Sequence, residues 1–113
     1  MAYWSDIEAG ISYLQELTES MRDNGKAAAK ADAAYRSIKA RAILEEKAKG
    51  TAATLCRDVI YDREDVQNAL MARNCTQADY EADKEAINTM KLKLRITDAQ
   101  IARDWQASGE RGY

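Results

Sequence analysis

The chain contains no proline, no phenylalanine and no histidine, and it has only five glycines. Proline and glycine are the residues that most often end helices and form tight turns, so their scarcity predicts long helices. Without histidine there is no imidazole for a serine or cysteine hydrolase mechanism and no histidine ligand for a metal ion. We therefore expect a protein that is not an enzyme and that uses no cofactor and no metal.

The overall composition narrows the class of protein further. Hydrophobic residues make up 46% of the chain and charged residues 32%, which is too apolar for a disordered chain and too rich in charge for a membrane span. A length of 113 residues suits one hydrophobic core. We expect a soluble protein that forms a single domain over residues 1–113 and does not associate with membranes.

The two cysteines bear on the redox environment. Cys56 and Cys75 are separated by 18 residues, belong to no CxxC pair and lie in a chain that begins without a signal-peptide pattern. Two thiols are too few to hold a metal ion. We therefore expect two reduced thiols and a cytoplasmic protein.

A first long helix is predicted over residues 5–49. Ser5 and Glu8 have the spacing of a capping box, in which each side chain satisfies a backbone N–H at the helix start. Asn24 and Gly25 are residues that can end a helix, yet the apolar stripe keeps its phase across them. One continuous helix is therefore predicted, with Gly50 as its stop. The stripe has heptad spacing at Ile7, Leu14, Met21, Ala28, Tyr35 and Ala42.

A short connector and a second long helix complete the predicted elements. Thr51 can cap a short helical turn that carries Leu55 and Ile60 over the tip of the long helices. The second helix is expected over residues 62–107, because carboxylates at its start suit the positive end of the helix dipole, and residues 108–113 are expected to form a flexible tail. Its heptad positions are Val66, Arg73, Tyr80, Ile87, Leu94 and Ile101.

The fold class predicted is all-α. Two helices of nearly equal length, joined by a short helical connector, favour a long antiparallel hairpin. The expected partners are Ile7 with Ile101, Leu14 with Leu94, Met21 with Ile87, Ala28 with Tyr80, and Ala42 with Val66. A second stripe that includes Leu92 and Ile96 would be left uncovered, which favours self-association into a four-helix bundle or a larger assembly, as a dimer or higher oligomer. The alternative is that the alanines of this stripe only reflect helix propensity.

The distribution of charge singles out one candidate binding set. Residues 1–25 carry a net charge of −4 and residues 26–49 a net charge of +4. The bases Lys26, Lys30, Lys39 and Arg41 are candidate contacts to the phosphates of a nucleic acid, single-stranded DNA in particular. The alternative is a solvated face whose charges pair with neighbouring carboxylates.

Aromatic residues gather at the two ends of the chain. Trp4 near the start and Trp105 near the end would meet at the open end of a hairpin. Such a cluster can anchor a partner or stack on bases, but closure of the bundle end as a hydrophobic plug is the interpretation we favour. Together with Leu92 and Ile96, we take both tryptophans as a candidate interface with a partner protein or another copy.

Several segments resemble one family. They are Tyr35-Arg36-Ser37-Ile38-Lys39-Ala40-Arg41-Ala42, the connector around Thr51, the heptad helix containing Tyr80-Glu81-Ala82, and Trp105-x-x-Ser108. In these features the chain resembles small helical-hairpin proteins of tailed bacteriophages and prophages that are often encoded beside single-strand annealing recombinases. The resemblance implies an accessory of phage DNA metabolism in the host bacterial cytosol.

These observations lead to one main hypothesis and two alternatives. The main hypothesis is a non-enzymatic, self-associating protein that acts as an accessory to phage DNA recombination or single-strand handling, with a recombination protein or single-stranded DNA as its partner. The first alternative is a phage inhibitor of a host defence protein, in which acidic side chains occupy a basic nucleic-acid channel. The second is a purely structural assembly subunit.

Overall fold

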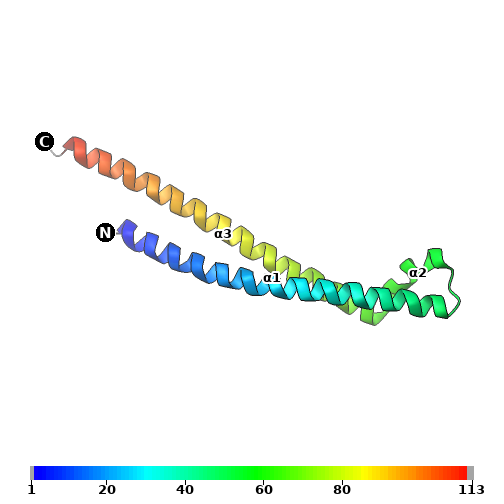
Figure 1. Cartoon of the computed structure of the whole chain (residues 1–113). Coiled ribbons are helices and arrows are strands. Elements are labelled where there is room, and N and C mark those ends of the chain that lie inside the picture. Colours follow the sequence, from blue (N-terminus) through cyan, green and yellow to red (C-terminus); the bar gives the residue numbers. More distant parts are fainter. Residues whose placement is uncertain (1, 112–113) are drawn as a thin grey trace. The chain divides into compact units, whose positions relative to one another are not determined.

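The structure is a computed structural model that describes the backbone of residues 2–111 and the side chains of residues 3–109. Four helical elements follow one another along the chain: α1 (Ala2–Ala48), α2 (Ala53–Val59), the short 3₁₀ helix η1 (Ile60–Asp62) and α3 (Glu64–Arg111) (Figure 1). No strand occurs within residues 2–111. The prediction of an all-helical fold with two long helices and a short helical connector is confirmed.

The ends of the long helices differ from those predicted. Helix α1 begins at Ala2, so Ser5 and Glu8 lie inside it and do not cap its start. Helix α3 begins at Glu64 and continues to Arg111, so residues 108–111, where a tail was expected, are helical. No proline interrupts either extension, and one glycine in a helix costs only about 1 kcal/mol. Residues 112 and 113 of the expected tail lie outside the described residues.

Helix α1 passes through Gly25 without interruption, as predicted. A Cβ atom at Gly25 would lie 3.3 Å from Cε2 of Tyr80, which shows how closely the tyrosine ring approaches this backbone. The sequence predicts Ala28, one turn away, as the partner of Tyr80. The apolar stripe repeats every turn, so it fixes which face is buried but not which turn faces which, and the glycine offers the closest approach.

Gly50 ends α1, again as predicted. Its φ of 92° lies in the left-handed region, which glycine adopts without steric cost. The Gly50 N–H donates to the carbonyl of Lys47 at 3.0 Å, and the Thr51 N–H donates to that of Glu46 at 3.2 Å. These two bonds form a Schellman motif, which satisfies carbonyl groups that the last helical turn leaves without partners.

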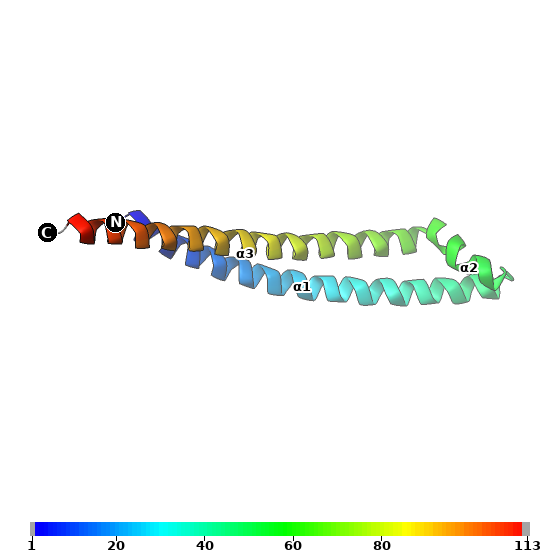
Figure 2. The ribbon, with the colours of Figure 1, turned by 90° about the horizontal axis from the view of Figure 1, so that it is seen from above.

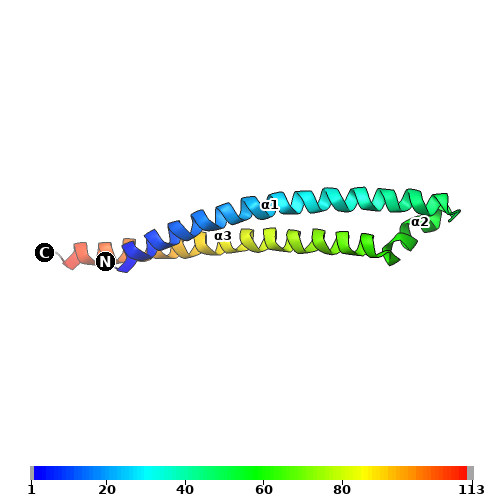
Figure 3. The same cartoon turned by 90° about the horizontal axis from the view of Figure 1, so that it is seen from below.

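The chain forms two compact units. We call the one built from the chain up to Met21 and from Ala82 onward the terminal unit, and the one that spans Arg22–Glu81 the connector unit. In the terminal unit α1 and α3 run antiparallel: a Cβ at Gly10 would lie 2.8 Å from Leu94, and Ser20 Oγ donates to Asp83 Oδ2 at 2.9 Å (Figure 3). Gly10, which lies one turn from the predicted partner Leu14, was not among the expected neighbours of Leu94.

The connector unit holds the largest fully buried side chains. Ile60 and Val66 are fully buried in a cluster with Ala42, and Ile38 and Ile43 pack against that cluster. Within this unit α2 lies between the end of α1 and the start of α3 (Figure 2). Ala42 and Val66, which were predicted to be partners, belong to this one cluster.

Two details predicted for the connector are wrong. Leu55 is 54% exposed, whereas Cys56 of α2 and Ile60 of η1 are buried. Thr51 does not cap α2, whose N-cap residue is Ala52 and receives no side-chain hydrogen bond. The Thr51 hydroxyl instead donates to Glu46 Oε2 at 3.2 Å.

Candidate functional site

Three of the four predicted nucleic-acid contacts share one exposed face of α1. Lys26 and Lys30 stand two residues before and after the buried Ala28, so both leave the helix on the side opposite to the buried one. Arg41 follows Lys30 by eleven residues, or three turns, and shares that face. All three are exposed, and no ion pair involves them in the described part of the chain.

Lys39, the fourth predicted contact, lies elsewhere. Its side chain is half-buried, and its Nζ lies 5.9 Å from the ring centroids of both Tyr35 and Tyr61. A cation over aromatic faces is stabilised by the ring electrons. Lys39 therefore belongs to the packing of the connector unit and not to the exposed basic face.

A pair of tyrosines forms the centre of this packing. The hydroxyl groups of Tyr35 and Tyr61 lie 3.3 Å apart, and the Arg73 guanidinium lies 5.3 Å from the Tyr35 ring centroid. The hydrogen bond between the hydroxyls raises the pKa of Tyr35 and lowers the pKa of Tyr61, as expected if Tyr35 donates. These contacts hold η1, which carries Tyr61, against α1, which carries Tyr35.

Some of the positive charge near the basic face is neutralised locally. Asp32 forms one ion pair with Arg36, at 3.1 Å, and another with Arg73, at 3.0 Å. Arg36 is thus paired within α1, and Asp32 joins α1 to α3. The alternative prediction, that charges on this helix pair with neighbouring carboxylates, holds for Arg36 but not for the three exposed bases.

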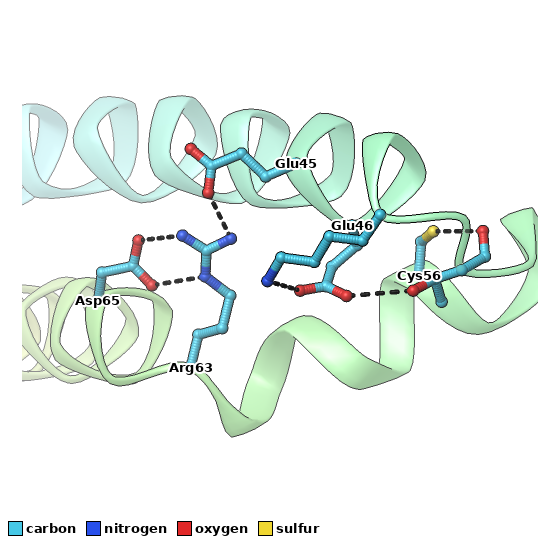
Figure 4. A network of polar contacts seen from close by, with 7 residues as sticks. Glu45, Glu46, Cys56, Arg63 and Asp65 are labelled. Carbon is cyan, nitrogen blue, oxygen red and sulfur yellow. Dashed lines mark hydrogen bonds and ion pairs between the residues drawn. The ribbon is translucent and has the colours of Figure 1, made fainter.

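A polar network joins the end of α1 to the start of α3 (Figure 4). The Arg63 guanidinium contacts Glu45 at 2.7 Å and makes two hydrogen bonds to Asp65, at 3.0 and 3.1 Å. These contacts lower the pKa of Asp65 and raise that of Arg63. Glu46 is only 7% exposed, and its carboxylate accepts a hydrogen bond from the Lys49 ammonium group at 3.3 Å.

This network was not predicted from the sequence, although one signal was present. A carboxylate in the last turn of a helix is disfavoured by the helix dipole, and both Glu45 and Glu46 occupy that part of α1. Two such residues at an unfavourable place indicate partners elsewhere in the chain, which are Arg63 and Thr51.

The predicted apolar interface residues are exposed. Leu92 and Ile96 are 54% and 56% exposed and stand two residues before and after the half-buried Leu94. They therefore leave α3 together, one turn apart, and Ile96 also lines the groove between α3 and α1. Trp4 is 64% and Trp105 77% exposed, so the favoured prediction, that these aromatic residues form a hydrophobic plug, is wrong.

A groove lies beside Ile96 in the terminal unit. It has a volume of about 430 Å³ and lies between α1 and α3. Its lining is largely apolar, with one carboxylate and one ammonium group: Asp6, Ala9, Gly10, Met90, Lys93, Leu94, Ile96 and Thr97. The groove and the exposed face of α3 together give this unit an apolar surface of the kind that accepts side chains of a partner.

Metal ligands, reactive thiols and membrane-spanning stretches were also sought among the described residues. No group of three or more His, Cys, Asp or Glu side chains that could hold a metal ion occurs among them. Cys56 is buried and its thiol donates to the Thr51 carbonyl at 3.6 Å, whereas Cys75 is exposed, and both are free thiols. No helix within residues 2–111 has a stretch that is both long and apolar enough to cross a membrane.

Comparison of the chain with protein-family models, with curated proteins and with solved structures finds no match. Its function must therefore be inferred from the surfaces described above.

Proposed function

We propose that this chain is a non-enzymatic binding and assembly protein, which acts by docking onto another protein through exposed apolar side chains of the terminal unit. The observation that carries the proposal is the pair Leu92 and Ile96. Single exposed apolar residues are common on protein surfaces. Two large branched side chains one turn apart, each more than half exposed and one of them lining an apolar groove, form a continuous docking surface instead.

The mode of binding follows from the shape of this surface. A partner helix that lies along α3 would cover Leu92 and Ile96 and insert a side chain into the groove, where Asp6 and Lys93 can pair with its polar groups. Trp105 is 77% exposed but follows Leu94 by eleven residues, so it lies on the side of α3 opposite to Leu92 and Ile96 and is not part of this docking surface.

The more specific proposal is an accessory of phage DNA recombination in the bacterial cytosol. It rests on the resemblance described above, and on the exposed face that carries Lys26, Lys30 and Arg41 for a role with single-stranded DNA. Binding through phosphate contacts weakens steeply with salt, with a slope of about 0.7 per neutralised phosphate on a single strand.

The docking proposal is tested by capture from infected-cell lysate with a tagged bait. Replacing Leu92 and Ile96 by glutamine should abolish capture of the partner, because it removes the exposed apolar side chains and leaves Leu94, which packs against Gly10 of α1, in place. Leu55→Gln is the matched control, since Leu55 is equally exposed but lies in the connector unit. Equal capture by the wild type and the Leu92/Ile96 variant would contradict the proposal.

The DNA role is tested separately by fluorescence anisotropy with a labelled oligonucleotide at low salt. Lys26→Glu with Lys30→Glu should abolish binding, whereas Lys91→Glu, which reverses an exposed lysine on α3, should not. If no oligonucleotide binds the wild-type chain at low salt, the DNA role is wrong and the structural assembly subunit is favoured.

A further inference from the structure

The connector unit contains a pocket of its own, between α2 and the last turns of α1. It has a volume of about 430 Å³, which is within the range of small-molecule sites. Helix α1 contributes Ile43 and Lys47, which are one turn apart, and α2 contributes Ala53, Thr54 and Arg57. All five residues belong to the connector unit. We call this hollow the tip pocket.

The lining of the tip pocket is positively charged. Lys47 and Arg57 each bring one positive charge, and none of the five lining residues is acidic. Asp58, which directly follows Arg57, does not line the pocket. Neither cation forms an ion pair in the part of the chain that the structure describes. Because two cations on the wall of one pocket repel each other, an anion between them would be bound favourably.

The two carboxylates in the last turn of α1 are engaged elsewhere. Glu45 forms an ion pair with Arg63 at 2.7 Å. The buried Glu46 accepts hydrogen bonds from the Lys49 ammonium group and from the Thr51 hydroxyl. Both acids thus belong to the polar network of Figure 4 and do not line the tip pocket. The fold therefore leaves the positive charge of the pocket without a carboxylate partner from these two residues.

The helix dipoles explain only part of this arrangement. Lys47 lies in the last turn of α1 and Arg57 in the last turn of α2, and bases are favoured at both places. The dipole of each helix acts on its own last turn, however. It gives no reason for the two cations to line one pocket together with the Thr54 hydroxyl.

We propose that the tip pocket binds a phosphate monoester. The Arg57 guanidinium can donate two parallel hydrogen bonds to one phosphate group, the Lys47 ammonium supplies a second positive charge, and the Thr54 hydroxyl supplies a further donor. A phosphate monoester carries a charge of about −1.5 to −2 at pH 7, which the two cations match. Ile43 and Ala53 form the apolar part of the lining, against which the carbon groups of the ester would pack.

This site is separate from the surfaces of the proposed function. Leu92 and Ile96 belong to the terminal unit. Lys47 follows Arg41 of the exposed basic face by six residues, so the two side chains leave α1 on different sides. A free nucleotide and the 5′ end of a DNA strand both carry a phosphate monoester, and the experiments below separate these two sources.

Isothermal titration calorimetry of the full chain tests the site, with inorganic phosphate and a nucleoside 5′-monophosphate as probes. Lys47→Gln and Arg57→Gln should each weaken binding about tenfold, because each removes a hydrogen bond between charged groups. Lys47→Arg, which keeps the charge, should retain binding. Arg22→Gln is the matched control and should bind like the wild type, since Arg22 is an exposed base of the same unit outside the pocket.

Fluorescence anisotropy identifies the source of the phosphate. If the ligand is a strand end, an oligonucleotide with a 5′-phosphate should bind more tightly than the same oligonucleotide with a 5′-hydroxyl. That difference should vanish when Lys47→Gln and Arg57→Gln are combined. If the ligand is a free nucleotide, the monophosphate should bind in calorimetry and the two oligonucleotides should behave alike.

Three results would overturn the proposal. The first is a wild-type dissociation constant above about 1 mM for both small probes, with no preference for the phosphorylated oligonucleotide. The second is wild-type affinity in Lys47→Gln and Arg57→Gln. The third is an equal loss of affinity in Arg22→Gln and Arg57→Gln, which would mean that phosphate meets the exposed bases of this unit without a defined site. An unchanged far-ultraviolet circular dichroism spectrum of each variant shows that lost binding does not come from unfolding.

Discussion

Replacing Gly50 by alanine tests the left-handed end of α1. The Gly50 φ is +92°, and a Cβ atom added there would meet no atom within 4 Å. The substitution therefore introduces no clash with other residues, and its cost comes from the backbone alone. An L-residue in the left-handed region costs about 1–2 kcal/mol, so Gly50→Ala should lower the free energy of unfolding by about that amount.

Gly109 provides the matched control. A Cβ atom there also meets nothing within 4 Å, but Gly109 lies within α3 and has no left-handed φ. Gly109→Ala should therefore raise the free energy of unfolding, by at most about 1 kcal/mol, because alanine favours helix. The same chemical change thus has opposite signs at the two sites.

Urea denaturation followed by far-ultraviolet circular dichroism measures both variants. Asparagine tolerates the left-handed region better than alanine, so Gly50→Asn should be less destabilising than Gly50→Ala. If Gly50→Ala is as stable as the wild type, α1 does not end in a left-handed glycine, and the reasoning about the Schellman motif is wrong.

Three further predictions concern the connector unit. Ile60→Ala should lower the free energy of unfolding by about 3 kcal/mol, whereas Leu55→Ala should change it by less than about 0.5 kcal/mol, because Ile60 is fully buried and Leu55 is exposed; similar losses in urea denaturation would contradict this packing. The Asp65 carboxyl has a pKa below its ordinary 3.8, so its contribution to stability is complete above that value and is lost as the pH falls through the lowered pKa. Asp65→Asn should therefore be less stable than the wild type at pH 7 and equally stable near pH 2, and a constant difference across a pH series of denaturation curves would refute this. A maleimide should label the exposed Cys75 in the folded protein and Cys56 only after unfolding, and equal labelling by mass spectrometry would show that Cys56 of α2 is not buried in the connector unit.

The sequence predicts well what depends on local pattern. The heptad stripe and the lack of proline predict α1 as one helix through Gly25, and Gly50 predicts its end. The same stripe predicts which residues are buried, including Ala42 and Val66. These features depend on backbone propensity and on the period of the helix, both of which can be read along one segment.

The sequence predicts poorly what depends on contacts between segments. The stripe predicts which face of α1 is buried, but the close approach of the Tyr80 ring to the Gly25 backbone was not predicted. Spacing alone places Lys39 on the side of the buried Ala28, which it follows by eleven residues, but its contact with Tyr61 depends on the connector, which brings that ring back onto α1. For the same reason the pairing of Arg63 with Glu45 was missed.

Burial is distributed unevenly between the two units. The largest fully buried side chains, Ile60, Val66 and Cys56, all belong to the connector unit, whereas the terminal unit leaves most of its large apolar side chains in contact with water. Separation of the helices should therefore start at the two chain ends, where proteases would cut first. A bound partner that covers these ends would slow degradation, so the lifetime of the protein in a cell would rise with the amount of its partner.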